Sequence, residues 1–212
     1  MALIEVTIER KTGTINLDPA PLNLRIAEYM VSSTQRKING GIKPGNAALT
    51  TAVKQNSRTL RDRGQLLASI TSRSDEKSAV VGTNHIGAKI NQFGGTIKAK
   101  KKWLFIPASS WTRKQQRKYG FGAGDVIRGL RKDGYNVWYQ VNQSSGVVMA
   151  EKKLKRKKRD GQGKVVHNSI VLFILKKSVV IPARPFLFVD DRDHKVIGRM
   201  LTEIVPKGEG EA

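Results

Sequence analysis

The stretch INQFGGT, residues 90–96, predicts the point at which the chain turns from a helix into a strand. The residues from His85 to Phe93 favour a short helix, and Gly94-Gly95 then stops it. Glycine tolerates a positive φ, so the chain can turn abruptly from a helix into a strand at this point. We expect Phe93 to anchor the corner in the hydrophobic core. The stretch therefore predicts a helix, a sharp corner and a strand.

A second stretch, IPARPFL at residues 181–187, is expected to be extended and to lie outside any central strand. Pro182 and Pro185 lack the backbone N–H that a strand ladder needs, and they bracket Arg184. The guanidinium of Arg184 can bond backbone carbonyls or a carboxylate as a fixed fork. Phe186 and Leu187 are predicted to be buried beside the last helix. These residues either hold the fold alone or also bind a partner, and we favour the first reading.

Outward from these stretches, the hydrophobic pattern predicts helices and strands in mixed order. Helical spacing of apolar residues predicts a long helix from Asp18-Pro19 to Gly40-Gly41, a second one at 49–60 and a last one at 190–205. Strand character is found at 3–8, 69–74, 78–83, 97–106, 136–141, 147–150, 168–175 and 179–181. The strands at 69–74 and 78–83 are expected to form one hairpin, and those at 136–141 and 147–150 another. This order predicts an α+β fold with a mainly antiparallel sheet. We expect one domain over residues 1–212, with a basic, variable insertion at about 108–167.

Charge is the strongest feature of the composition. The 212 residues include 39 basic and 17 acidic ones, a net charge of +22, and residues 108–167 hold 15 of the basic and 4 of the acidic ones. Such an excess indicates a polyanionic neighbour, either nucleic acid or an acidic protein surface, unless it only solubilises a loop. Cysteine is absent, which excludes disulfides and thiolate zinc sites. No apolar run approaches the ~20 residues of a membrane span, so no membrane contact is expected.

Seven of the eight residues at 152–159 are basic, namely Lys152, Lys153, Lys155, Arg156, Lys157, Lys158 and Arg159. We expect a solvent-facing loop that faces DNA phosphates or an assembly partner, or contacts nothing. No aromatic residue lies between 151 and 164, so a base-stacking platform is not expected there. The glycine-rich stretch 120–124 lacks the spacing of a phosphate-binding loop and predicts a flexible loop.

The residues needed for catalysis are not grouped in the sequence. His85, His167 and His194 stand in no recognisable nucleophile motif. Asp190, Asp191 and Asp193 fall at the start of the last predicted helix, where carboxylates cap free amides and favour the helix dipole. We interpret them as capping residues and not as metal ligands. We therefore expect no enzyme activity, no cofactor and no metal site.

Four short motifs in order resemble those of the phage virion-morphogenesis family. They are LRDRGQL with Ser69-Ile70 at 60–70, VVGTN at 80–84, INQFGGT at 90–96 and IPARPFL at 181–187. The family's motif residues carry over to ten positions that we expect to be critical for the fold: Asp62, Gly64, Gln92, Phe93, Gly94, Gly95, Pro182, Arg184, Pro185 and Phe186.

The resemblance implies a structural virion protein at the phage head–tail junction, of the tail-completion, neck or tail-terminator type. It further implies a ring, commonly of six copies, assembled in the host cytoplasm, with the tail tube protein and head connector proteins as partners and DNA in the lumen. The rival hypothesis rests on charge alone and is a sequence-independent DNA-binding accessory protein. An enzyme such as a nuclease would need clustered acidic residues that the sequence lacks.

Overall fold

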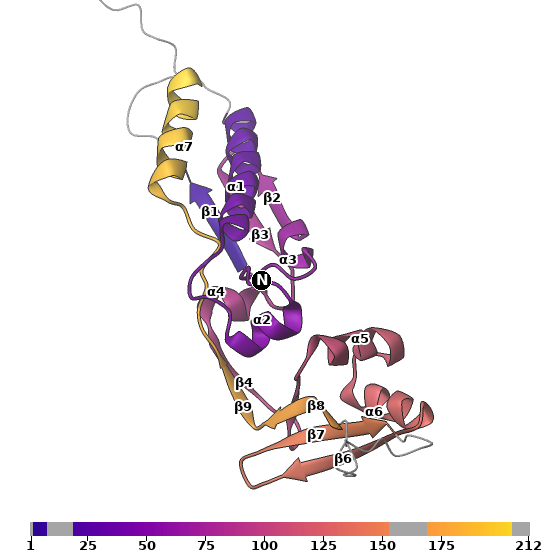
Figure 1. The fold of residues 1–212 in the computed structure, drawn as a ribbon. Helices are drawn as coiled ribbons and strands as arrows, with labels where there is room; N and C mark the ends of the chain where they lie inside the picture. The colour runs from indigo at the N-terminus through magenta and orange to yellow at the C-terminus, as the bar shows by residue number, and fades with distance from the viewer. Residues whose placement is uncertain (1, 8–18, 153–168, 205–212) are drawn as a thin grey trace, which may run out of the picture. The chain divides into compact units, whose positions relative to one another are not determined.

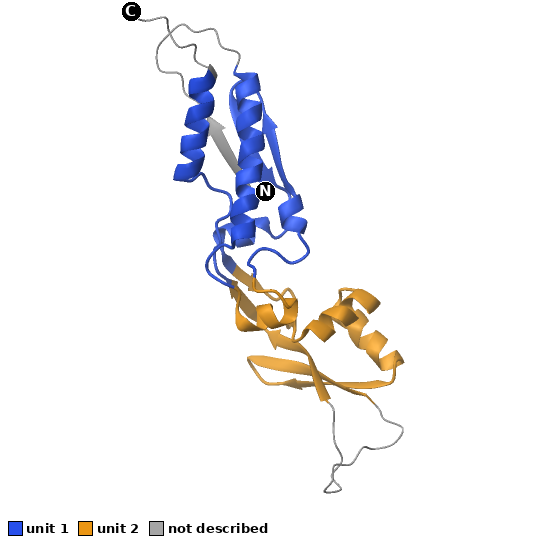
Figure 2. Cartoon of the chain, turned by 45° about the horizontal axis from the view of Figure 1, so that its top comes forward, with its two compact units in different colours: residues 1–45, 58–95, 181–212 blue, residues 46–57, 96–180 orange. Residues whose placement is uncertain are grey.

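The computed structural model describes residues 2–7, 19–152 and 169–204. The chain forms two compact units (Figure 1, Figure 2): unit 1 comprises residues 1–45, 58–95 and 181–212, and unit 2 comprises residues 46–57 and 96–180. Both units combine helices with antiparallel strands, which confirms the predicted α+β class. Residues 108–167 all belong to unit 2. The division into one domain with an insertion at 108–167 stays a prediction.

Unit 1 is built on the long helix α1 (Ala20–Gly40). The helix begins after Pro19 and ends where Gly41 adopts a φ of 85°, so the predicted helix and its glycine end are confirmed. Glycine is favoured at this position because a side chain there would strain the backbone. The apolar residues at helical spacing form the buried face: Leu22, Ile26, Ala27, Met30 and Ile38.

One face of a three-stranded antiparallel sheet packs against α1. The strand order is β1 (Ala2–Thr7), β3 (Ser78–Thr83) and β2 (Ile70–Ser74). Val81 and Ala79 of β3 and Ile70 of β2 are buried in the core of unit 1. Three further helices add to this core, namely α3 (Gln65–Ala68) through Leu66, α4 (Ala88–Phe93) through Ala88, and α7 (Asp191–Ile204) through Ile197. The predicted hairpin at 69–83 is confirmed.

The main part of unit 2 is a four-stranded antiparallel sheet with two helices on one face (Figure 1). The strand order is β5 (Leu104–Pro107), β8 (Ser169–Lys176), β7 (Ser145–Lys152) and β6 (Tyr135–Val141). The helices are α5 (Ser110–Tyr119) and α6 (Ala123–Lys132). Their apolar sides and the facing side of the sheet form a second core: Val126, Ile127, Leu130, Val137, Val148, Ala150, Leu172, Phe173 and Leu175.

The helices α5 and α6 were not expected, and the prediction of a flexible loop at 120–124 was wrong for its second half, because α6 begins at Ala123. Two signals were present in the sequence. The hydroxyl of Ser109 accepts a hydrogen bond from the Thr112 N–H at 3.2 Å and so caps α5. Val126, Ile127 and Leu130 have the spacing of one buried helix face.

Two other predicted elements have different bounds. The strand expected at 97–106 is two strands, β4 (Gly95–Lys98) and β5, interrupted at Lys100 to Lys102. Three consecutive lysines cannot alternate between a buried and an exposed face, and all three are exposed. β4 pairs with β9 (Ser178–Ile181) in a two-stranded sheet. The helix expected at 49–60 is shorter, since α2 (Ala48–Lys54) ends where Gln55 adopts a φ of 57°.

The prediction that Phe93 anchors the Gly-Gly corner in the core is wrong. Its side chain is 66% exposed, whereas Phe186 is completely buried as predicted. The reason lies in the geometry of α4, which buries Ala88. Phe93 comes five residues later, about 140° around the helix from Ala88, and points away from the core. Gln92 comes four residues after Ala88, so it lies on the same face of the helix as Ala88 and points toward the core instead.

The two phenylalanines provide a matched pair for a stability measurement. We expect Phe186→Ala to lower the free energy of unfolding by about 3–5 kcal/mol, because it leaves a cavity in a closed core. Phe93→Ala should lower it by less than about 1 kcal/mol, because the side chain is already exposed. Urea denaturation followed by circular dichroism measures both values. Equal losses for the two variants would contradict this assignment of the core.

Candidate assembly surfaces

The two stretches INQFGGT and IPARPFL lie directly against each other in unit 1. Gly94 has a φ of 70°, and a Cβ at that position would lie 2.7 Å from the Ala183 nitrogen and 3.0 Å from the Ile181 oxygen. The backbone N–H of Arg184 donates to the Asn91 oxygen at 2.6 Å. Glycine is therefore required for two reasons, since the backbone is left-handed there and another backbone occupies the space of a side chain.

The amide of Gln92 fixes the second stretch by three hydrogen bonds. Its Oε1 accepts from the N–H groups of Phe186 at 2.9 Å and Leu187 at 3.1 Å, and its Nε2 donates to the Leu187 oxygen at 2.9 Å. The segment 182–190 is neither helix nor strand, so these backbone groups have no ladder partner. One side chain therefore takes the place of a neighbouring strand and holds Phe186 and Leu187 in the core.

Arg184 is 8% exposed, and its guanidinium is used within the fold. Nε donates to the Pro44 oxygen at 2.7 Å, and Nη2 donates to the Gly45 oxygen at 2.8 Å. The sequence predicted that Arg184 bonds either backbone carbonyls or a carboxylate, and in the structure it bonds backbone carbonyls. Arg184 thus ties residues 44–45 to the second stretch.

The structure brings together only part of the ten predicted motif residues. Gln92, Gly94, Arg184 and Phe186 meet at the corner described above. Asp62 and Gly64 lie instead just before α3, where Gly64 adopts a φ of 79° as the residue preceding the helix. Gly95 has a φ of 144° and follows Gly94 into β4, and Pro182 and Pro185 are exposed. Phe93 is not expected to be critical for the fold, because its side chain is exposed, whereas the critical role of the other nine stays a prediction.

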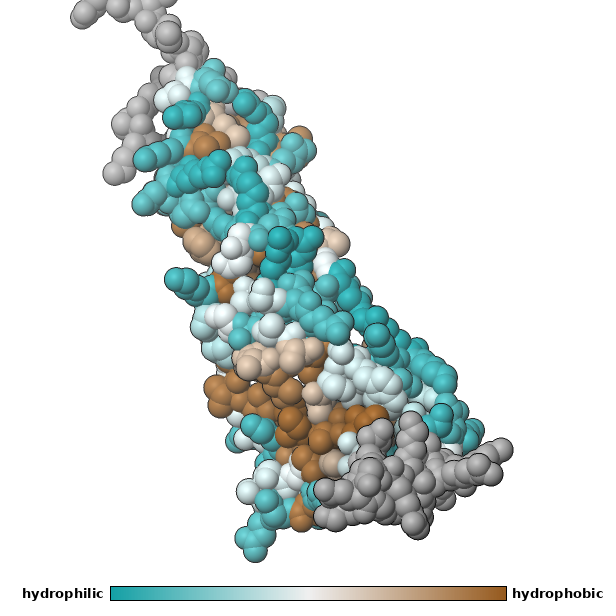
Figure 3. Space-filling model, viewed as in Figure 1, coloured by the Kyte–Doolittle hydropathy of each residue, from teal (hydrophilic) through white to brown (hydrophobic). Residues whose placement is uncertain are grey.

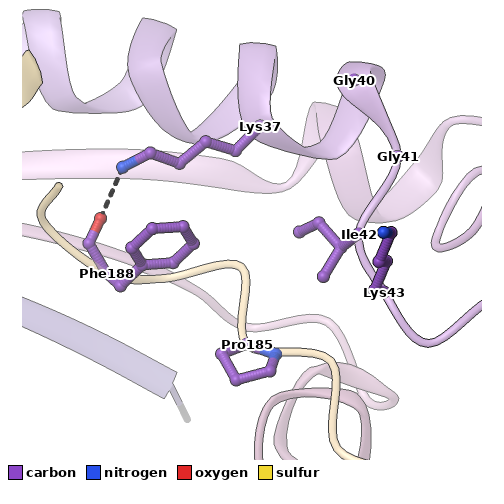
Figure 4. A pocket seen from close by; sticks show the side chains of 7 residues that line it. All are labelled: Lys37, Gly40, Gly41, Ile42, Lys43, Pro185 and Phe188. Atoms are coloured by element: carbon purple, nitrogen blue, oxygen red, sulfur yellow. Dashed lines mark hydrogen bonds between the residues drawn. The ribbon is translucent and has the colours of Figure 1, made fainter.

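A surface pocket of about 560 Å³ lies beside the second stretch in unit 1 (Figure 4). The end of α1 and residues 41–43 form one wall, and Pro185 and Phe188 form the other. The Lys37 Nζ lies 4.2 Å from the centre of the Phe188 ring and donates to the Phe188 oxygen at 2.7 Å. The cation–π contact and the hydrogen bond hold the Lys37 side chain along the wall of the pocket. Its ammonium group therefore interacts with the protein's own residues.

Lys37 also forms an ion pair with Asp193, which is completely buried. The Asp193 carboxylate accepts from Lys37 at 2.5 Å, from the Ser33 hydroxyl at 2.5 Å and from the Tyr29 hydroxyl at 3.1 Å. Burial alone would raise the pKa of Asp193, but the hydrogen bonds and the charge of Lys37 outweigh it and lower the pKa to about 2. This carboxylate is ionised and fully bonded, so it is not available as a base.

The predicted capping role of the aspartates is correct for two of them. Asp190 Oδ1 accepts from the Asp193 N–H at 2.9 Å, and the Asp190 N–H donates back to Asp193 at 3.1 Å. This reciprocal pair closes the first turn of α7. The ion pair with Lys37 could not be predicted, because the two residues are 156 positions apart.

The two histidines in the described part of the chain, His85 and His194, share no site. The Nδ1 of His85 accepts from the Gly87 N–H at 3.1 Å, in the turn before α4. His194 is exposed, and His167 lies outside the described residues. In residues 2–7, 19–152 and 169–204, no group of three acidic, histidine or cysteine side chains is placed to hold a metal ion. Over the same ranges, no helix is both long and apolar enough to cross a membrane.

The basic run at 152–159 is mostly outside the described residues. Lys152 is the last residue of β7 and is exposed, and the other six basic residues of the run belong to the part that the structure does not describe. The prediction of a solvent-facing loop is therefore untested. Further basic residues of the predicted insertion at 108–167 lie on α5 and α6, where their outer faces are exposed.

The sheet of unit 2 carries apolar residues on both faces. The helix-covered face carries the buried core, and the register aligns two rows on the other face. One row is Trp138, Met149 and Val171, and the other is Gln140, Val147, Ile174 and Ile106. Most of these side chains are half-buried, and Val171 is 36% exposed. Figure 3 shows hydrophobic residues reaching the surface of unit 2.

Comparison with known proteins identifies the family. The model of the phage virion morphogenesis family matches residues 7–119, more than half of the chain. The chain belongs to this family. Membership confirms the resemblance and assigns the protein to phage virion morphogenesis. The match ends before the IPARPFL stretch, which the Gln92 hydrogen bonds join to the matched part.

A named relative of this phage virion morphogenesis protein is the Mu-like prophage FluMu G protein 2 of Haemophilus influenzae. The two are 38% identical over 89 residues, which is 42% of this chain and 62% of the relative. The match therefore spans less than two thirds of the relative's own length. No solved structure matches the chain.

The close approach at Gly94 leads to a test with a matched control. We expect Gly94→Ala to lower the free energy of unfolding by roughly 2–5 kcal/mol, from the strained backbone and the contact with Ala183. Gly198→Ala makes the same chemical change in α7, where a Cβ meets no atom within 4 Å, and should leave stability unchanged or raise it by up to about 1 kcal/mol. Urea denaturation measures both. A Gly94→Ala variant as stable as the parent would refute the close approach.

The Lys37–Asp193 pair predicts a pH-dependent stability. Asp193→Asn should lower the free energy of unfolding at pH 7 by about 2 kcal/mol, less than for a fully buried pair because Lys37 is partly accessible. The pKa of Asp193 is lower in the folded chain than in the unfolded one, so its contribution is present above about pH 4 and is lost as the pH falls through about 2. The difference between parent and variant should shrink over that range.

Urea denaturation at pH 7, 4 and 2.5 measures this difference. Asp191→Asn is the control, because Asp191 is exposed, and it should change stability by less than about 0.5 kcal/mol. A gap between parent and Asp193→Asn that stays constant down to pH 2.5 would show that Asp193 has no lowered pKa.

Proposed function

We propose that this chain is a structural subunit of the phage head–tail junction, of the tail-completion, neck or tail-terminator type, and that it catalyses no reaction. Family membership supports a role in virion morphogenesis. The observation that carries the finer proposal is the second apolar face of the unit 2 sheet. A sheet with apolar residues on both faces is typical of a subunit that is covered by another protein in its assembled state.

The apolar residues of that face are aligned, which makes them a continuous surface. Trp138, Met149 and Val171 lie opposite one another on β6, β7 and β8. Directly paired residues on neighbouring strands have Cβ atoms about 4.5–5.5 Å apart, so the three side chains form one ridge. Large aromatic and methionine side chains of this kind are enriched at the centres of protein interfaces.

Further large apolar side chains are exposed on both units. Ile86 is 99% and Phe93 66% exposed in unit 1, and Phe121 is 68% and Val180 73% exposed in unit 2. Single exposed apolar residues are ordinary on a protein surface. Four large apolar side chains that are each at least 66% exposed are consistent with several contact surfaces. We propose that they contact the neighbouring copies of the chain in a ring, commonly of six, and the tail tube and head connector proteins. The protein then acts in the virion after assembly in the host cytoplasm, with DNA in the lumen and no membrane contact.

A structural role also accounts for the use of the polar motif residues. Gln92 and Arg184 of the motifs, and Asp193 of α7, have polar or charged side chains that could serve a catalytic site, but each has its hydrogen bonds inside unit 1. Their arrangement holds backbone segments together. We therefore propose that the motifs preserve the shape of a building block.

A second candidate function, a sequence-independent DNA-binding accessory protein, is favoured by the charge of unit 2. Unit 2 holds 22 of the 39 basic and 4 of the 17 acidic residues. The two functions differ in where the protein acts. A junction subunit is a stoichiometric component of the virion neck, whereas an accessory protein is absent from the finished particle.

A phage that lacks this gene tests the proposed function. We expect its lysate to contain full heads and separate tails, with joined particles restored by the gene supplied from a plasmid. Negative-stain electron microscopy counts the three kinds of particle. Cryo-electron microscopy of the parent virion should then show several copies of the chain at the neck. Normal joined particles without the gene would refute the junction role.

The apolar sheet face gives a point mutation for the same assay. Val171→Glu places a charge on the proposed contact ridge, so the purified protein should not oligomerise and should restore head–tail joining at least about tenfold less well. Val141→Glu is the control, since Val141 is 52% exposed at the end of β6 and is not part of either row. Light scattering gives the mass, and circular dichroism shows that both variants fold. Equal behaviour of the two variants would contradict this contact surface.

A further inference from the structure

Unit 2 carries nearly all of the charge of this protein. Its 22 basic and 4 acidic residues give +18, while unit 1, with 17 basic and 13 acidic residues, gives +4. The excess does not depend on the basic run at 152–159. The described residues of unit 2 alone include 15 basic and 3 acidic ones.

Much of this described charge lies on the outer faces of α5 and α6. Each helix packs apolar residues against the core of unit 2, through Trp111 on α5 and through Val126, Ile127 and Leu130 on α6. Each also has three exposed basic residues at spacing i, i+3 and i+4, which places them on one side of the helix. These six are Lys114, Arg117, Lys118, Arg128, Arg131 and Lys132.

The acidic residues next to these helices are already paired. Asp133 accepts from Lys118 at 2.8 Å and from the Tyr119 hydroxyl, and the hydrogen bond from Lys118 is the main cause of its lowered pKa. Asp125 pairs with Arg128 one turn away on α6. In the described part of the chain, no carboxylate pairs with Lys114, Arg117 or Lys132. Arg131 donates one N–H to the Val137 oxygen at 3.1 Å and keeps its remaining donors.

We propose that the outer faces of α5 and α6 bind the phosphate backbone of duplex DNA without sequence preference. Exposed cations that lack protein partners gain by neutralising phosphates and releasing the counterions that surround DNA. The composition of the surface favours DNA over an acidic protein. Lysine is depleted at the centres of protein interfaces, whereas lysine and arginine dominate phosphate contacts. Phe121 is the one large apolar side chain that is exposed in residues 110–132.

This site goes beyond the proposed function and does not depend on it. The surface lies on the opposite side of the unit 2 sheet from the row of Trp138, Met149 and Val171. A subunit built in this way can contact a protein with one side of unit 2 and DNA with the other. Loss of DNA binding and loss of head–tail joining are separate results, because the first is measured on the purified chain.

Fluorescence anisotropy with a labelled 30-base-pair duplex of random sequence tests the proposal on the full-length chain. The test variant is K114E/R117E/K132E, which reverses three exposed cations of α5 and α6 that pair with no carboxylate of the described residues. The matched control is K89E/K195E/R199E, which reverses three exposed cations of unit 1 and changes the net charge by the same amount. A third variant, K155E/R156E/K157E/K158E, tests the run at 152–159. Circular dichroism and thermal melting verify the fold of each.

We expect the α5–α6 variant to bind at least tenfold more weakly than the parent at 100 mM salt, and the unit 1 control to stay within about threefold. The slope of log affinity against log salt should fall by about 2–3 in the α5–α6 variant, since each phosphate contact contributes about 0.9. An equal loss in both triple variants would show that net charge alone attracts DNA and would overturn the proposal. A loss confined to the 155–158 variant, or poly-glutamate competing as well as DNA, would overturn it as well.

Discussion

The three hydrogen bonds of the Gln92 amide are the contact on which unit 1 depends. The segment from Pro182 to Asp190 runs through the protein without joining a sheet, and two prolines prevent it from doing so. Its backbone groups still need partners where they are buried, and Gln92 supplies three of them at once. That amide holds Phe186 and Leu187 in the core of unit 1, and the chain continues from them into α7. Glycine at position 94 allows the two stretches to come this close, because any side chain there would meet the Ala183 backbone.

This contact closes a long excursion of the chain. Between the INQFGGT and IPARPFL stretches lie residues 97–180, nearly all of unit 2. The entropy of closing a loop grows only slowly with its length, so unit 1 can tolerate a large segment between the two stretches once their contact is strong. Unit 2 has its own sheet and its own core. The charge on its surface therefore does not have to be accommodated in the packing of unit 1. The composition of the two units differs accordingly, with +18 in unit 2 and +4 in unit 1.

Within unit 2, one sheet separates two kinds of surface. The side chains of a regular strand point alternately to opposite faces, and the register shift between Val148 and Met149 adds one extra residue, Leu172, on β8. This bulge places Val148 and Phe173 under the helices and Met149 and Val171 on the other side. The helices then cover the first face and present their basic sides outward. An apolar face and a basic face on opposite sides of a thin layer suit a subunit that contacts protein on one side and a polyanion on the other.

The sequence by itself determined the α+β class, the long helix that ends at Gly40-Gly41, both hairpins and the family, because these follow from local spacing and short motifs. It also showed that Phe186 is a core residue. Tertiary structure decided the remainder. Whether Phe93 or Gln92 points inward depends on which side of α4 faces the core, and no local pattern in six residues reports that. The Lys37–Asp193 pair, the Arg184 contacts with residues 44–45 and the two faces of the unit 2 sheet join positions far apart in the chain. Such contacts arise from packing, so a single sequence shows the residues but not their partners.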